Sequence, residues 1–164
     1  MPDKIVQGDL LYHSVHGLCR VREIIKQKKS LYYSIVPKLT NQMKVRFVIA
    51  VEDLGTSGFH LLVSSKEANR ILKYLKEGDN ALVQDNQTWE LAKTILSFSN
   101  DELETKDQRN RQTLERSANG LVRELAFVME ITVKEAAARI RKSLGNASKI
   151  NPLVLSALEH AVED

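Results

Sequence analysis

The sequence predicts an α+β protein in which a small antiparallel β-barrel precedes a domain built only from helices. Between residues 9 and 51, short runs of β-branched and aromatic residues alternate with turn-prone breaks, which is typical of strands. After residue 58, apolar residues recur every three or four positions, which is typical of helices. With 164 residues, of which 43% are hydrophobic and 27% charged, the chain is long enough for two small globular domains.

The first element is predicted to be a four-stranded meander, with strands near residues 9–12, 17–25, 31–38 and 43–51. The connections between these runs have hairpin length, so neighbouring strands should pair antiparallel. Meanders of this size curl into small barrels of the SH3-like or Tudor-like kind. Gly17 marks a tight turn, because glycine enters positive φ without a steric cost.

A helix is predicted to follow the strands and to cover the barrel. A capping box indicates its start, since Ser64 can accept from the backbone near Glu67 while Glu67 bonds back. Its apolar face comprises Ala68, Ile71, Leu72 and Leu75, and it ends at Gly78. The polar stretch 79–88 is typical of a connection, so the predicted domains are 1–78 and 89–164.

Four helices are predicted in the second domain. The first spans 89–98, and the second runs from a capping box at 99–102 toward Met129. The third, 133–144, opens with a capping box at 132–135 and stops at Gly145. Asn151 followed by Pro152 is a start signal for the fourth.

Composition excludes several classes of protein. No apolar run approaches the roughly 18 residues that span a bilayer, and residues 1–10 lack the apolar core of a signal peptide, so we expect a cytoplasmic protein with no membrane partner. Cys19 is the single cysteine, which excludes an intramolecular disulfide and a cysteine-rich zinc site. His13 and His16 lie close to it in sequence, but a lone buried cysteine is usually a small apolar residue.

The sequence also lacks the common catalytic and cofactor-binding motifs, including the glycine-rich nucleotide loops, the zinc-binding HExxH and the nucleophile elbow GxSxG. We therefore expect a non-enzymatic binding protein without a cofactor, a metal or a small-molecule substrate. Charge is unevenly distributed, with +5 over residues 1–80 and −2 over 81–164. Within the acidic half, residues 134–149 carry +4, which suits either a phosphate-facing patch or an ordinary solvated helix face.

Two stretches of the chain resemble the CarD/CdnL family of bacterial transcription regulators. Residues 8–21 are similar to the opening strand, turn and strand of that family's RNA polymerase-interacting domain, with matches at Gly8, Asp9, Tyr12 and Gly17, although His13 stands where the family has proline. Residues 121–126 and 130–136 are similar to the end of the family's helical domain.

This resemblance implies a regulator whose β domain binds the β subunit of RNA polymerase and whose helices contact promoter DNA at the upstream edge of the transcription bubble. In the family, a tryptophan wedged into the minor groove stabilises the open complex, and Trp89 is the candidate here. Trp89 as a core residue of the helical domain is the alternative, because the chain is about one helix shorter than the family between Trp89 and the matched C-terminal stretch.

Basic residues supply the other candidate contacts. Lys28, Lys44 and Arg46 are predicted to bind the polymerase, and Arg139, Arg141 and Lys142 are predicted to bind DNA together with Trp89. Such a protein would be nucleoid-associated. The competing interpretation is a protein–protein adaptor that binds the polymerase or another partner without touching DNA, and the negative charge of residues 81–164 favours it.

Overall fold

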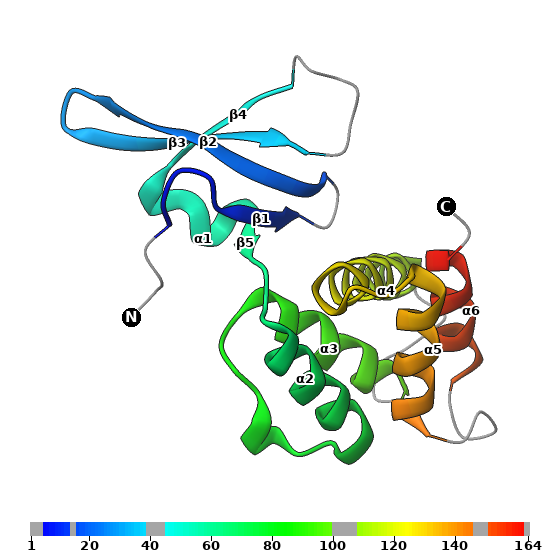
Figure 1. The fold of residues 1–164 in the computed structure, drawn as a ribbon. Coiled ribbons are helices and arrows are strands. Elements are labelled where there is room, and N and C mark those ends of the chain that lie inside the picture. Colours follow the sequence, from blue (N-terminus) through cyan, green and yellow to red (C-terminus); the bar gives the residue numbers. More distant parts are fainter. Residues whose placement is uncertain (1–4, 14–15, 39–44, 100–107, 146–150, 163–164) are drawn as a thin grey trace. The chain divides into compact units, whose positions relative to one another are not determined.

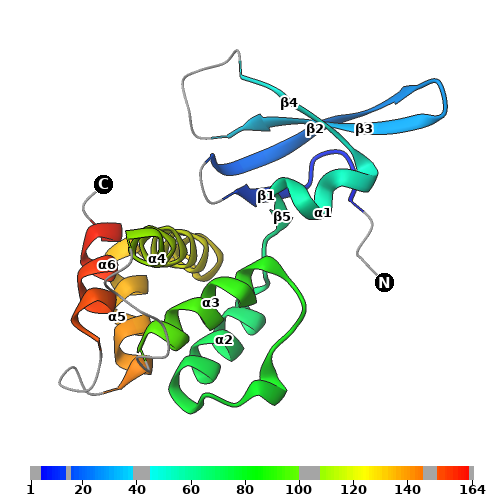
Figure 2. The same cartoon turned by 180° about the vertical axis from the view of Figure 1, so that it is seen from behind.

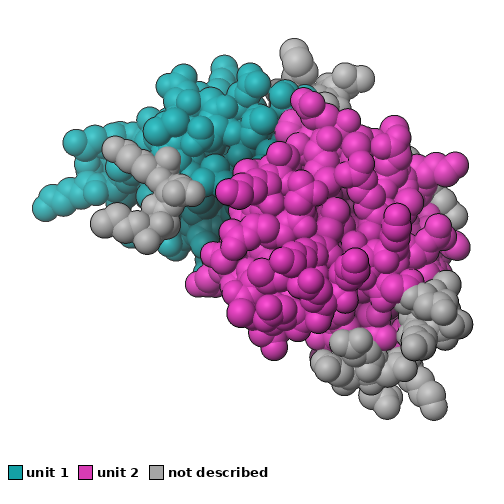
Figure 3. All heavy atoms as spheres, turned by 60° about the horizontal axis from the view of Figure 1, so that its bottom comes forward, with its two compact units in different colours: residues 1–62 teal, residues 63–164 magenta. Residues whose placement is uncertain are grey.

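The computed structural model describes residues 5–13, 16–38, 45–99, 108–145 and 151–162, and the chain divides into two compact units (Figure 3). Residues 1–62 form the sheet unit and residues 63–164 form the helical unit. The α+β class predicted from the sequence is confirmed. In the described part of the chain, no helix has both the length and the apolar character needed to cross a bilayer.

The sheet unit is a five-stranded antiparallel sheet in the order β4-β3-β2-β1-β5 (Figure 1). Its strands are β1 (Leu10–His13), β2 (Gly17–Gln27), β3 (Ser30–Pro37), β4 (Phe47–Ala50) and β5 (His60–Leu61). The two end strands, β4 and β5, are not paired with each other among the described residues, so the predicted barrel closure is not seen. The sequence did not indicate β5, because a strand of two residues is too short to show an alternation of apolar and polar residues.

One face of the sheet carries the small core of this unit. Leu11, Cys19, Val21, Tyr33 and Ile35 are buried there, together with Ile5 and Phe59. A bulge between Val21 and Glu23 shifts the register of β2 against β3, and the residues of β2 after the bulge are largely exposed. A 3-10 turn, η1 (Val51–Asp53), and the short helix α1 (Leu54–Ser57) lead from β4 to β5.

The helical unit contains five α-helices and a 3-10 turn in its described residues (Figure 2). These are α2 (Ser65–Glu77), η2 (Asn80–Leu82), α3 (Gln87–Ser99), α4 (Gln108–Met129), α5 (Val133–Leu144) and α6 (Pro152–Val162). The capping oxygens of Ser64 and Thr132 accept from the backbone three residues later, as predicted. The predicted capping box at 99–102 falls largely outside the described residues.

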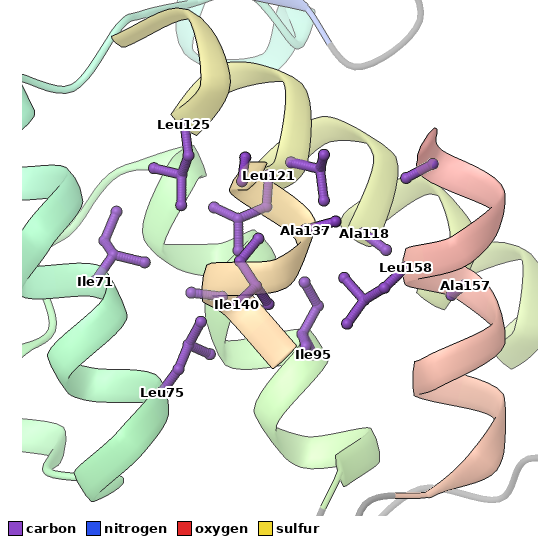
Figure 4. Packing of buried hydrophobic residues seen from close by; sticks show 14 of the residues in the cluster. Ile71, Leu75, Ile95, Ala118, Leu121, Leu125, Ala137, Ile140, Ala157 and Leu158 are labelled. Carbon is purple, nitrogen blue, oxygen red and sulfur yellow. The ribbon is translucent and has the colours of Figure 1, made fainter. Parts of the chain in front are cut away.

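All five α-helices contribute to one apolar core. In Figure 4, Ile71 and Leu75 of α2 point toward Leu121 and Leu125 of α4 and toward Ile140 of α5. The sequence placed α2 over the barrel, whereas the structure places it in the helical unit. An apolar helix face does not specify its partner, and here the helices supply the surface that buries it. The division between the units therefore falls at residue 62, ahead of the predicted boundary at 78.

Candidate functional site

Trp89 is a core residue of the helical unit. Its side chain is fully buried, and its indole N–H donates to Glu67 Oε1 at 2.8 Å. The Tyr74 ring meets it edge-on at a centroid distance of 5.7 Å, and Asn86 Oδ1 accepts from the Trp89 backbone N–H at 3.1 Å. A buried, hydrogen-bonded indole reaches a base step only by leaving this core. The structure thus agrees with the alternative interpretation, in which Trp89 is a core residue.

Glu124 forms a buried polar link that the sequence analysis missed. The carboxylate is completely buried, and its Oε2 accepts from the Val63 backbone N–H at 3.2 Å and from Thr88 Oγ1 at 2.8 Å. It thereby connects the first residue of the helical unit, α3 and α4. One sequence signal could have revealed it, since Arg123 and Glu124 are the two polar residues within the apolar stretch 121–129 of α4. Its inward position and paired partners indicate a structural role.

The predicted polymerase-binding residues do not form one patch. Arg46 is exposed directly before β4, next to Phe47, which pairs with Ile35. Lys28 is exposed in the β2–β3 turn, at the opposite end of β3, with a positive φ of 54°. Since β3 begins at Ser30, these two cations lie at least about 20 Å apart at about 3.3 Å per residue. Lys44 lies outside the described residues.

Strand β4 is an edge of the sheet with an apolar, accessible surface. It pairs with β3 on one side, and no described strand pairs with its other side. Val48 is 49% exposed within the strand, and Val45 and Val51 are exposed on either side of it. An unpaired edge leaves backbone N–H and C=O groups available to another strand. The strand therefore has the features of a docking edge for a partner's sheet.

Aromatic and histidine rings gather between the β1–β2 turn and β4. The His16 ring lies 4.5 Å from His13 and 4.4 Å from Phe47, and His13 lies 4.7 Å from Phe59. Burial and then the neighbouring His16 lower the pKa of His13, whose Nδ1 accepts from the His16 backbone N–H at 3.3 Å. This cluster ties the turn to the start of the edge strand.

The histidines and the cysteine are candidates for metal ligands and for a reactive thiol, because His13 and His16 are close to Cys19 in the sequence. The described residues contain no group of three histidine, cysteine or acidic side chains placed to hold a metal. Cys19 is fully buried, and burial raises the pKa of its thiol to about 11, so it is not a reactive thiolate near neutral pH.

The predicted DNA-binding cations lie on α5, and all three are exposed. Arg141 and Lys142 line a groove of about 680 Å³ between α5 and α6, hereafter the α5–α6 groove. Lys134 lines it as well, whereas Arg139 does not. The structure therefore separates Arg139 from the other two, which the sequence could not do.

No protein-family model matches the chain, and no curated protein matches it significantly. The resemblance to CarD/CdnL regulators therefore stays a prediction.

Proposed function

We propose that this chain is a non-enzymatic, cytoplasmic transcription regulator that binds the β subunit of RNA polymerase through the open edge of its sheet unit. The observation that carries the proposal is the β4 edge, which has no second partner strand among the described residues, with the exposed Val48 in its middle and the exposed Arg46 beside it. The resemblance of residues 8–21 to a polymerase-interacting domain supports the choice of partner. Association with the polymerase would also make the protein nucleoid-associated.

The binding mode follows from β-strand addition. A strand of the partner extends the sheet at β4, so that backbone hydrogen bonds supply affinity and the side chains of alternate residues supply specificity. Val48 offers an apolar contact, and Arg46 favours an acidic partner surface. An SH3-like or Tudor-like class for the sheet unit belongs to this proposal, because β5 returns beside β1 as it would in such a barrel.

Binding of the full chain to RNA polymerase and to an isolated β-subunit lobe tests the proposal. Val48→Lys places a charge on the edge, and we expect it and Arg46→Glu each to weaken binding by about tenfold. Val48→Ile is the matched control, because it keeps both the apolar character and the branched shape that favours a strand, and it should bind normally. Absence of polymerase binding by the unmodified chain would refute the proposal.

Charge reversal at Lys28 tests whether the polymerase contacts β4 or the β2–β3 turn. If β4 is the docking edge, Lys28→Glu should leave binding unchanged, because Lys28 lies at the far end of β3. A loss for Lys28→Glu together with normal binding by Arg46→Glu would move the contact to the β2–β3 turn.

DNA contact by the helical unit is a second candidate, favoured by the exposure of Arg139, Arg141 and Lys142 on α5. With Trp89 buried, these cations would act on phosphates alone, so affinity should fall steeply with salt and show little sequence preference. Fluorescence anisotropy with a duplex containing a melted bubble tests this candidate. Reversal of all three charges should abolish DNA binding. If the unmodified chain does not bind the duplex, the adaptor interpretation, in which the protein does not contact DNA, is favoured.

A further inference from the structure

The α5–α6 groove has an apolar floor that opens to solvent. Ala137 and Ala138 line it from α5, while Leu155 and Leu158 line it from α6. Because each alanine contributes only a methyl group, the α5 side is low and leaves room for an inserted side chain. Ala138 is exposed and Leu155 is half-buried, so part of this floor is in contact with water. Phosphates gain nothing from such a floor, whereas apolar side chains do.

The rim of the groove is strongly basic. Lys134, Arg141 and Lys142 are exposed, and none of them has an ion-pair partner in the described part of the chain. Glu159 is the single acidic residue among the described residues that line the groove. Helix stability accounts for Arg141 and Lys142, which lie in the last turn of α5, but not for Lys134 in the first turn, where the helix dipole disfavours a cation.

The spacing of these cations matches a helix. Lys134 and Arg141 are seven residues apart on α5, which corresponds to about 10 Å and two helical turns. We propose that the α5–α6 groove binds an acidic amphipathic helix of a partner protein, with the helix's apolar face on the alanine and leucine floor and its carboxylates paired with Lys134, Arg141 and Lys142. This is the helix-in-groove mode of recognition, with anchors on one face and charges beside them.

The test uses the full chain and a synthetic, fluorescein-labelled helical peptide of about 18 residues, long enough to form a helix. Leucines occupy one face of the peptide and glutamates flank them. We expect Arg141→Glu combined with Lys142→Glu to weaken binding by about tenfold, measured by fluorescence anisotropy, and raised salt to weaken it as well. Ala138→Phe fills the groove without changing any charge, and we expect a similar loss.

Arg139→Glu is the matched control, because Arg139 is exposed on the same helix but does not line the groove, and its binding should be unchanged. Circular dichroism checks that each variant is folded, and Arg141→Gln with Lys142→Gln replaces the double reversal if that one is not. Binding of a scrambled peptide as tight as that of the amphipathic one would overturn the proposal, as would normal binding by Ala138→Phe.

DNA binding is the remaining outcome. If duplex DNA displaces the peptide and Arg139→Glu weakens both ligands as much as Arg141→Glu does, α5 is a phosphate-binding face and the helix proposal fails. This result is independent of polymerase binding, which the sheet unit is proposed to carry, so the two proposals can fail separately.

Discussion

The helical unit buries its apolar side chains far more completely than the sheet unit does. Seven large hydrophobic residues are exposed in the described chain, and Phe127 alone among them belongs to the helical unit. The other six are Val6, Ile24, Leu31, Val45, Val48 and Val51. A small unit covers its apolar surface poorly, since surface grows relative to volume as size falls. The difference indicates that the sheet unit leaves more of its large apolar side chains accessible to a partner than the helical unit does.

The two units also differ in how well their buried polar groups are hydrogen-bonded. In the helical unit, the Trp89 indole and the Glu124 carboxylate both have short hydrogen bonds. In the sheet unit, Ser34 Oγ is buried without a partner among the described residues. Since an unsatisfied buried group costs free energy, the helical unit should be the more stable of the two, and substitutions in it should have the larger effects.

Trp89→Ala should have the largest effect. Loss of the buried ring should destabilise the helical unit by about 3–5 kcal/mol and lower its melting temperature by many degrees. Far-UV circular dichroism during heating measures this effect. Trp89→Phe keeps most of the ring and should lose less. A normal melting temperature for Trp89→Ala with a shortened open-complex lifetime would contradict the core assignment and restore the wedge.

Glu124→Leu should come second. The substitution leaves the Val63 N–H and the Thr88 hydroxyl without their acceptor, so we expect a loss of about 2–3 kcal/mol in the free energy of unfolding. Urea denaturation measures it. Glu124→Gln retains an acceptor oxygen and should lose less than half as much. Equal losses would mean that the charge of Glu124, and not its hydrogen bonding, stabilises the unit.

Lys28→Gly tests the sheet unit and should be stabilising. Lys28 has a φ of 54°, a conformation that glycine adopts without strain, so the gain should be about 0.5–1 kcal/mol. Amide hydrogen exchange in β2 and β3 measures it. Lys29→Gly is the control, since Lys29 has no positive φ and should not be stabilised. A destabilised Lys28→Gly would show that the lysine side chain supports the turn.

The smallest effect should be the pH dependence of the β1–β2 turn. The pKa of half-buried His13 is lowered from 6.5, so the unfolded chain takes up a proton at a higher pH than the folded chain does. Its stabilising contribution is therefore complete above about pH 6.5 and is lost as the pH falls toward the folded-state pKa. The protection factors of the turn amides, which are corrected for the intrinsic pH dependence of exchange, should fall over that range, and His13→Phe should reduce the change. Protection factors that rise on acidification would contradict the sign.

The sequence predicted what is decided locally. Helix starts at Ser64 and Thr132, the stop at Gly78 and the β1–β3 meander depend on neighbouring residues, and the structure confirms them. Packing partners were not predictable, because the apolar face of α2 suits a barrel as well as a helix bundle. The same limit applies to Trp89, whose burial depends on Glu67 and Tyr74, residues far from it in the sequence.

The surfaces were predicted only in part. Arg139, Arg141 and Lys142 are neighbours in sequence, and charge counting groups them. The structure distinguishes them, because Arg141 and Lys142 line the α5–α6 groove and Arg139 does not. Likewise, both Lys28 and Arg46 are basic residues of the predicted β domain, and only the strand register shows that they lie at opposite ends of β3.

Because Cys19 is buried, its reaction with a thiol reagent reports on the opening of the sheet unit. Each unit holds one spectroscopically or chemically unique residue, Cys19 in the sheet unit and Trp89 in the helical unit. A thiol reagent added to the native protein can modify Cys19 only when the sheet opens, so the labelling rate measures the opening equilibrium of that unit. Trp89 emission follows the other unit in the same sample. The effect of a bound partner on each unit can thus be followed without introducing a new cysteine or tryptophan.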